Sequence, residues 1–271
     1  MTTAAPARAS VVALVNRGHA IGDAVTMAWR NLLNIRRNPQ LMVFATVQPV
    51  IFVVMFRYVF GGAIQGSLPA GQSYINYLMP GVFVQTIVFG ALTTAVGLAD
   101  DLNKGLIERF RSLPMARSAV LVGRTFADLV RNFFVLILVC AVGFVVGWTI
   151  GTNVWGLVGA FGIILAFAYS LSWLFAIVGL SVKDGETAQA VSFPILAVLV
   201  FASSAFVPVA TMPSWMQPWA RNQPVSVVID AARVLTIGGP TSDSVIKAII
   251  WVVVIVAVCA PIAIARYRKV V

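Results

Sequence analysis

Six long apolar runs constrain the fold of this chain more than any other feature of its sequence. Each run holds about 20 residues, which is enough for an α-helix to cross a hydrocarbon core of roughly 30 Å. Helix is the expected form because lipid offers the backbone no hydrogen-bond partners. The fifth run is the least regular, since Pro194 lies inside it. The predicted spans are Leu41–Phe60, Asn76–Ala99, Arg131–Ile150, Trp155–Val182, Gln189–Val209 and Val245–Ala265.

The composition supports the same class. Of the 271 residues, 60% are hydrophobic and only 10% are charged, whereas about a quarter of a soluble domain is charged. We therefore expect an all-α integral membrane protein with a single domain over residues 1–271. A cytoplasmic tail and an interfacial helix occupy 1–40, the six spans occupy 41–265, and a short cytoplasmic tail occupies 266–271. Cys140 and Cys259 lie inside apolar runs and are expected to pack as free thiols.

The distribution of Lys and Arg predicts the orientation. All but four of the 19 such residues fall before the first span, between the second and third, between the fourth and fifth, or after the sixth. Loops rich in Lys and Arg stay in the cytoplasm, so both termini are expected there. The net charge of +10 is then a topology signal, and the expected partners are membrane lipids and not nucleic acid. The four exceptions are Arg57, Arg221, Arg233 and Lys247.

One charged segment, residues 100–123, interrupts the apolar pattern between the second and third spans. As a helix it would be amphipathic and would end at Pro114, which lacks an N–H group. In the cytoplasm such a helix is either a solvated loop or a docking surface. Its apolar face would carry Leu102, Leu106, Phe110 and Leu113, and its charged face Lys104, Glu108 and Arg111.

Two further amphipathic regions flank the spans. Ala20–Arg37 alternates apolar and basic residues around Trp29 and is expected to lie in the membrane interface, the alternative being a soluble helix packed on a neighbour. Phe206–Ser242 contains Trp215 and Trp219, followed by Pro224–Thr236, in which Asp230 and Arg233 can pair. This outer region either dips into the leaflet or caps a cavity, or it lies flat as an interfacial loop. The sequence leaves these alternatives open.

The sequence lacks the residues of several kinds of catalytic and binding site. The one histidine, His19, lies in the N-terminal tail, and no Gly-x4-Gly-Lys-Ser/Thr stretch is present. No catalytic triad and no metal-ligand set can be drawn from the remaining residues. We therefore expect this chain not to be an enzyme and to hold no metal.

The predicted spans also lack carboxylates, which ion-coupled carriers place within their spans. Asp128 precedes the third span on one helix face with Arg124 and Arg131, which predicts local neutralisation of charge. With neither an ion-coupling residue nor a nucleotide site, the chain is either a passive conduit or is driven by a soluble partner. Such a partner could act on Gly105–Pro114 and on Lys183–Thr187.

Two motifs carry a family resemblance. One is Gly105-Leu-Ile-Glu-Arg-Phe-Arg-Ser-Leu-Pro114, followed by Arg117 and Gly123-Arg124. The other runs from Val207-Pro208 through Met212-Pro213-Ser-Trp-Met-Gln-Pro218 to Asn222-Gln-Pro224, with Asp230 and Arg233 downstream. In combination they resemble the permease subunits of type-2 ABC exporters, in particular the daunorubicin-resistance type of actinobacteria. The match covers essentially the whole chain.

This resemblance implies a six-span half-transporter in a bacterial cell membrane, paired with a second permease copy or a homologue. Two separate cytoplasmic ATPase subunits would bind ATP and Mg²⁺, so the chain itself would need no cofactor. The segment Asp101–Leu113 would be a coupling helix held in a cleft of the ATPase, and Phe206–Thr236 would form outer re-entrant helices. The substrate would be an exported amphiphile: a drug, a lipid or a glycolipid.

The resemblance places coupling roles on Gly105, Glu108, Arg109, Phe110 and Pro114. We expect the same contact surface to include Asp101, Lys104 and Arg111, and from the second cytoplasmic loop Lys183, Asp184 and Glu186. Residues that could line the substrate path are Gln85, Thr86, Ser203 and Ser204, and helix packing is the alternative role of each. A passive channel or carrier that works without an ATPase is the alternative function.

Overall fold

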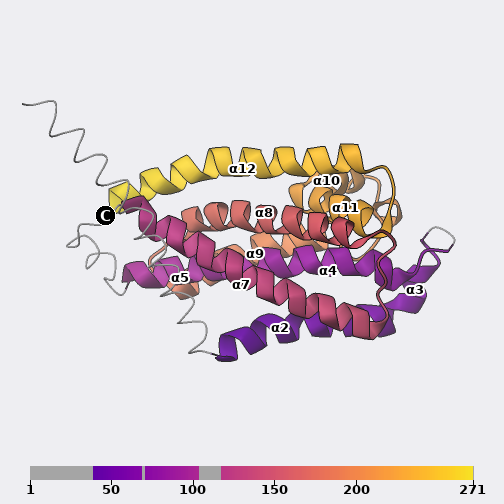
Figure 1. The fold of residues 1–271 in the computed structure, drawn as a ribbon. Coiled ribbons are helices and arrows are strands. Elements are labelled where there is room, and N and C mark those ends of the chain that lie inside the picture. The colour runs from indigo at the N-terminus through magenta and orange to yellow at the C-terminus, as the bar shows by residue number, and fades with distance from the viewer. Residues whose placement is uncertain (1–38, 69–70, 104–116, 271) are drawn as a thin grey trace, which may run out of the picture.

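The computed structural model describes residues 39–68, 71–103 and 117–270 (Figure 1). Every regular element in these ranges is helical, which confirms an all-α fold for the described part of the chain. The predicted interfacial helix Ala20–Arg37 lies outside these ranges. Residues 104–116, which hold most of the charged segment, also lie outside them.

The helices run in this order: α2 (Pro39–Val54), the π-helical turn η1 (Met55–Phe60), α3 (Gly61–Gln65), α4 (Tyr74–Gly90), α5 (Leu92–Asn103), α7 (Arg117–Val146), α8 (Val154–Gly179), α9 (Gly185–Phe201), the short 3-10 turn η2 (Val209–Thr211), α10 (Gln217–Asn222), α11 (Pro224–Ile237) and α12 (Thr241–Val270).

Within the described residues, five helical stretches are long and apolar enough to cross a membrane, which supports a multi-pass membrane protein. The predicted fifth span corresponds to α9, which has only 17 residues. A total of six spans therefore stays a prediction. The five stretches are Val47–Gln65, Tyr74–Asn103, Gly123–Val146, Val154–Gly179 and Ser242–Lys269.

The predicted end of the fifth span at Val209 is wrong. The helix α9 ends at Phe201, and residues 202–208 leave the helical conformation. Hydropathy does not mark this end, because Ala205, Phe206 and Val207 continue the apolar run. The backbone can leave the helix here because side chains from α4 and α11 bind its carbonyl groups, as described below.

The third apolar stretch begins before its predicted first residue, Arg131. The helix α7 starts at Arg117, and the stretch itself starts at Gly123. The second stretch likewise extends to Asn103. Both stretches, unlike the predicted spans, therefore include carboxylates near one end, where groups on adjacent helices bind them. The carboxylates concerned are Asp100, Asp101 and Asp128.

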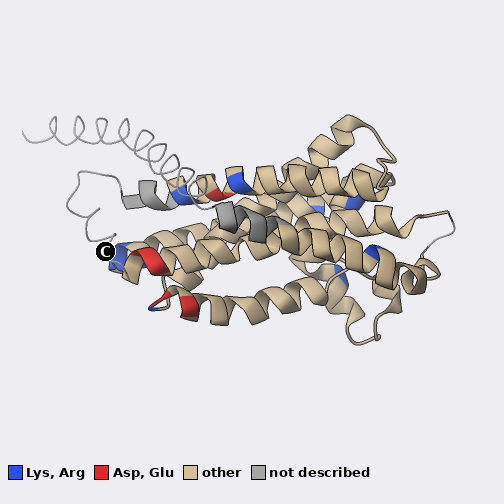
Figure 2. Ribbon diagram, turned by 90° about the horizontal axis from the view of Figure 1, so that it is seen from below, with Lys and Arg blue, Asp and Glu red and all other residues tan. Residues whose placement is uncertain are grey.

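The helix α4 is the centre of the bundle, since 14 of its 17 residues are buried. It contacts α2, α7, α8 and α11. The first span and α12 instead lie along opposite edges (Figure 1), and only 17% of the most apolar window of each is buried. Charged residues lie mostly toward the two ends of the bundle, with long uncharged ribbon between them (Figure 2). The bundle thus has an uncharged middle and an exposed apolar surface.

The helices α10 and α11 fill one end of the bundle. The predicted apolar face of α11, made of Val225, Val228, Ile229 and Ala232, is buried, and α11 packs against α4, α8 and α12. This segment is therefore packed into the bundle and does not lie flat on its surface. The exposed Trp215 and Trp219 precede it, and tryptophans are typical of a membrane interface.

Candidate functional site

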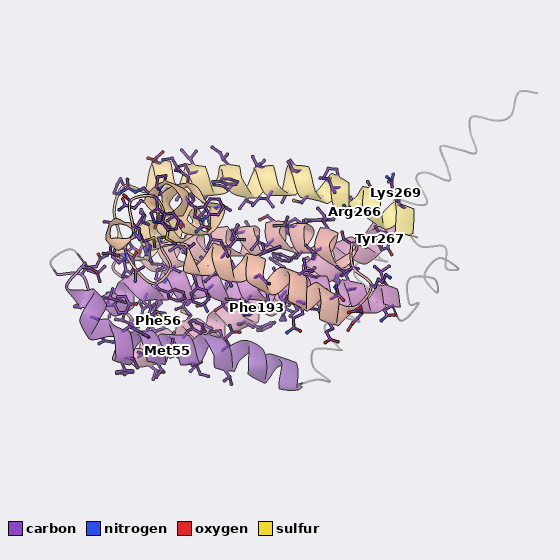
Figure 3. All side chains as sticks on the ribbon, turned by 180° about the vertical axis from the view of Figure 1, so that it is seen from behind. Met55, Phe56, Phe193, Arg266, Tyr267 and Lys269 are labelled. Carbon is purple, nitrogen blue, oxygen red and sulfur yellow. The ribbon has the colours of Figure 1, made fainter. Side chains whose placement is uncertain are left out.

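Three aspartates join α5, α7 and α9 at the end of the bundle opposite α11. We call Asp100, Asp101 and Asp128, with the groups that bind them, the aspartate cluster. The C-terminal end of α12 lies at this same end, where Tyr267 packs against Leu98 of α5 and Trp173 of α8 (Figure 3). Residues 104–116 connect α5 to α7 here, and residues 180–184 connect α8 to α9.

Asp100 connects the end of α5 to the start of α9. Its Oδ1 accepts a hydrogen bond of 3.1 Å from the backbone N–H of Gly185, the first residue of α9. A methyl group added at Gly185 would overlap with this oxygen, so only glycine lets the two groups meet. A carboxylate at a helix N-terminus also interacts favourably with the helix dipole. The loop of residues 180–184 is therefore attached to the base of α5.

Asp101 connects α5 to α7. Its Oδ2 lies 2.6 Å from Nη1 of Arg124, and the two side chains are 24% and 17% exposed. The guanidinium lies so close to Gly97 that a side chain at position 97 would overlap with it. This ion pair is partly shielded from water and lies one turn before residues 104–116.

Asp128 is neutralised deeper in the same cluster, as its spacing predicted. Its Oδ2 accepts a 2.6 Å hydrogen bond from Thr94, and its Oδ1 lies 3.5 Å from Nη1 of Arg131. Arg131 also donates to the carbonyl of Gly90 at 2.9 Å and to the hydroxyl of Thr93. These contacts tie α7 to the junction between α4 and α5.

Asp184 caps the first turn of α9. Its Oδ1 accepts a hydrogen bond of 2.7 Å from the backbone N–H of Thr187. This bond is the main reason that the pKa of the Asp184 carboxyl is below its ordinary value. The carboxylate is therefore charged at neutral pH, and it stabilises the end of α9 that Asp100 holds.

The predicted coupling residues divide into two groups. Asp101 and Asp184 make the contacts above, while Lys183 and Glu186 are exposed beside them. The remaining predicted residues lie outside the described ranges: Lys104, Gly105, Glu108, Arg109, Phe110, Arg111 and Pro114. A coupling role for any of these residues stays a prediction. No sequence pattern predicted that Asp100 and Gly185 meet, because this contact joins residues 85 positions apart.

A second polar site lies at the α11 end of the bundle. We call Arg233 and the groups around it, namely Tyr77, Ser204, Ala205 and Asp230, the Arg233 network. Arg233 donates from Nε to the Tyr77 carbonyl at 3.1 Å and from Nη2 to the Ser204 carbonyl at 2.5 Å. Its Nη1 lies 3.0 Å from Oδ1 of Asp230, which confirms the predicted pair. The guanidinium also lies 3.6 Å from the centre of the Tyr77 ring.

The Arg233 network accounts for the backbone that leaves α9 early. The Ser204 carbonyl also accepts from the Tyr77 hydroxyl at 3.1 Å, and the Phe206 carbonyl accepts from the Tyr74 hydroxyl at 3.0 Å. Gln223 donates to the Ala202 carbonyl at 2.7 Å. Non-helical backbone at membrane depth is tolerated only where such partners exist. The side chains of α4 and α11 thus replace the missing helical hydrogen bonds.

Gly81 allows the close approach on which this arrangement depends. A methyl group added at this position of α4 would overlap with the backbone carbonyl of Ala205. Backbone cannot move aside as a flexible side chain can, so α4 and the segment after α9 meet only because residue 81 lacks a side chain.

The four predicted path residues are all buried, and three of their hydroxyl groups bind nearby protein groups. Thr86 donates to the Val82 carbonyl, Ser203 to the Val200 carbonyl, and Ser204 to Asp230. Gln85 differs, because its buried Oε1 has no hydrogen-bond partner among the described residues. A path role for all four stays a prediction, and the contacts of the three hydroxyl groups are those of helix packing.

An aromatic feature that was not predicted connects the first span to the end of α9. Phe56 stacks on Phe206 with 4.2 Å between ring centroids, and Phe52 lies 6.3 Å from Phe201. With Phe60 these residues form what we call the phenylalanine cluster. The spacing of Phe52, Phe56 and Phe60, four residues apart, is the signal that could have revealed it. Phe201 and Phe60 remain about half exposed, so the cluster opens onto the surface of the bundle.

Two comparisons with known proteins agree on the family. The family model described as ABC-2 type transporter matches residues 23–237. A daunorubicin resistance ABC transporter permease protein of Streptomyces coeruleorubidus is 32% identical over 253 residues, which is 93% of this chain and 88% of that protein. A doxorubicin resistance ABC transporter permease protein of Mycobacterium tuberculosis is 28% identical over 195 residues, or 69% of this chain and 66% of that one. The chain therefore belongs to the ABC-2 type transporter family, as one of its membrane permeases.

Proposed function

We propose that this permease is one half of an ATP-driven exporter that moves an amphiphilic drug, lipid or glycolipid out of the cytoplasm or the inner leaflet. A separate cytoplasmic ABC ATPase binds ATP and Mg²⁺ and supplies the energy. A second permease copy or a homologue completes the membrane part. Both termini face the cytoplasm, so the aspartate cluster lies at the cytoplasmic end.

The observation that carries this proposal is the bond between Asp100 and Gly185. It joins the base of α5 to the start of α9 beside the two loops on which an ATPase could act. A push on residues 104–116 would reach α7 directly and through the pair of Asp101 and Arg124. The same push would reach α9 through Asp100. One cytoplasmic contact could therefore tilt three helices.

The other end of α9 suggests where the substrate passes. The phenylalanine cluster connects α9 to the first span. About two turns before Phe201 on α9, Phe193 is 50% exposed and packs on Phe89 of α4, nearer the middle of the bundle than Phe56 (Figure 3). Such a surface suits the apolar body of an amphiphile, since aromatic rings bury much apolar area. The names of the relatives specify daunorubicin and doxorubicin, which makes daunorubicin the first substrate to try.

The test is charge reversal in the predicted coupling segment. In membranes that also contain the partner ABC ATPase, Glu108→Lys and Arg109→Glu should abolish daunorubicin efflux and permease-stimulated ATP hydrolysis. Membrane insertion should be unchanged. Lys247→Glu is the matched control, because Lys247 is exposed at the opposite end of the bundle. Normal efflux in both coupling variants would overturn the proposed docking.

The alternative function, a passive channel or carrier, has its own test. The purified chain alone in liposomes should show no daunorubicin flux, with or without ATP. Flux from the chain by itself would establish that it is a passive channel or carrier and needs no ATPase.

A further inference from the structure

Arg57 is the one basic residue that the first apolar stretch, Val47–Gln65, contains. It lies in η1, where the helix widens into a π-helical turn. Such turns are rare and are frequently found at functional sites. A charged residue within a membrane span is costly unless a partner neutralises it. The partner of Arg57 therefore bears on the role of this turn.

The described part of the chain supplies none. The Nε of Arg57 is buried and has no hydrogen-bond partner. The described ion pairs join Asp101, Asp128, Asp230 and Asp243 to other cations. No described carboxylate therefore neutralises Arg57, and its guanidinium is available to an anion from outside this part of the chain.

The position of Arg57 on its helix shows where that charge can approach. Val53 and Gly61, four residues to either side, are buried, so the stem of Arg57 starts on the inner side of the helix. Tyr58 and Val59, the next two residues, are 69% and 70% exposed. The turn thus lies at the edge of the bundle, with one side against other helices and the other side open to the membrane.

Arg57 lies near the end of the bundle at which α4 begins. Gly61 lies beside Tyr74, the first residue of α4, and Arg57 precedes it by about 6 Å along the helix axis. Phe56, its neighbour in the π turn, lies toward the α10 and α11 end (Figure 3). A long arginine side chain can extend its charged group over such a distance toward the interface.

We propose that Arg57 binds the phosphate group of a phospholipid in the leaflet at the α11 end, with the acyl chains against the exposed surface of η1. A guanidinium group matches phosphate because its N–H donors form parallel, charge-assisted hydrogen bonds. Phosphate is the abundant anion at this depth of a bilayer. The apolar residues around the turn, Val54, Val59 and Phe60, are exposed and offer contacts to the chains.

The experiment measures lipid binding to the purified full chain by native mass spectrometry and by thermal unfolding in detergent. The probes are phosphatidylglycerol, diacylglycerol with the same chains, and inorganic phosphate. Phosphatidylglycerol should bind and stabilise the protein, whereas the two partial probes should not. Arg57→Gln should weaken phosphatidylglycerol binding by about tenfold, the effect of one lost charge-assisted bond. Arg57→Lys should fall between the two.

Arg221→Gln is the control, because Arg221 is also at the α11 end but is exposed and bonded to Gln217. It should bind phosphatidylglycerol like the unaltered protein. Equal binding by Arg57→Gln would overturn the proposal, as would equal stabilisation by diacylglycerol. If inorganic phosphate without any lipid stabilises the protein, the site binds a free anion, and the proposed phospholipid is wrong. If Arg57→Gln does not fold, Arg57→Lys and the probe comparison on the unaltered chain still decide.

Discussion

The aspartate cluster and the Arg233 network both join helices, but they do so at opposite ends of the bundle and by different contacts. In the aspartate cluster, carboxylates bind side-chain groups and the N-terminus of one helix. Asp101 and Arg124 are also partly exposed. In the Arg233 network, one buried guanidinium binds backbone carbonyls. Side chains can change partners, whereas backbone carbonyls cannot leave without moving a segment. We infer that the first site can rearrange during work and that the second holds its shape.

The largest expected effect is the loss of Arg233. Arg233→Ala removes a donor from the buried carbonyls of Tyr77 and Ser204 and a partner from Asp230, which should destabilise the protein by about 3 kcal/mol. Arg233→Lys keeps the charge but not the forked set of donors and should be intermediate. Thermal unfolding in detergent measures both, with Arg221→Ala as an exposed control. Unchanged stability of Arg233→Ala would show that the Arg233 network does not hold the segment after α9 in place.

The second effect is steric and concerns Gly81. Gly81→Ala places a methyl group against the backbone of Ala205, and this overpacking should cost about 1–3 kcal/mol. Gly162→Ala in α8 is the matched control, because no atom lies within 4 Å of its added methyl group. The control should unfold at the same temperature or higher, since alanine favours helix. Similar behaviour of the two variants would mean that α4 and the segment after α9 do not hold each other closely.

The third effect should appear in activity more than in stability. In Gly97→Ala and Gly185→Ala the added methyl group displaces the side chain of Arg124 or Asp100, and both can move. We expect stability to change by less than about 1 kcal/mol. ATP hydrolysis stimulated by the permease should fall roughly fivefold or more, because the connection from loop to helix is weakened. Gly162→Ala again serves as the control. Full stimulation in both variants would show that the cluster does not transmit the push.

The smallest effect is the dependence of the α9 cap on pH. Hydrogen bonds hold the pKa of Asp184 below its ordinary value in the folded protein. Its stabilising contribution is therefore present above the unfolded pKa of roughly 4 and is lost as the pH falls through the folded value. Asp184→Ala should lower the unfolding temperature slightly and by a constant amount between about pH 5 and pH 8. A difference that changes within this range would exclude the carboxylate cap as its cause.

The sequence predicted the helices that follow from hydropathy. The fourth and sixth predicted spans agree with Val154–Gly179 and Ser242–Lys269 to within a few residues. The pairing of Asp230 with Arg233 and that of Asp128 with Arg131 follow from helical spacing and are confirmed. Cys140 and Cys259 are free and buried, as expected. Patterns within one helix are therefore readable in the sequence.

Contacts between distant residues were not predictable. The end of α9 at Phe201 depends on Tyr77 and Arg233, which lie far away in the chain. The meeting of Asp100 with Gly185 depends on how two helices pack. Hydropathy predicts neither contact, because it describes neighbouring residues in the chain and both contacts join residues that are far apart. The same limit applies to the phenylalanine cluster. Phe52, Phe56 and Phe60 on the first span recur every four residues, but no such spacing marks Phe201 and Phe206.

The early end of α9 has a consequence for the bilayer itself. A helix of 17 residues is about 25 Å long, which is less than the roughly 30 Å of hydrocarbon in a typical membrane. If α9 is the predicted fifth span, lipid beside its exposed residues Val191, Ile195 and Val198 meets a short apolar surface, and the two leaflets would come closer together. Such thinning costs only a fraction of a kcal/mol per ångström. It would shorten the apolar distance across the bilayer beside this permease.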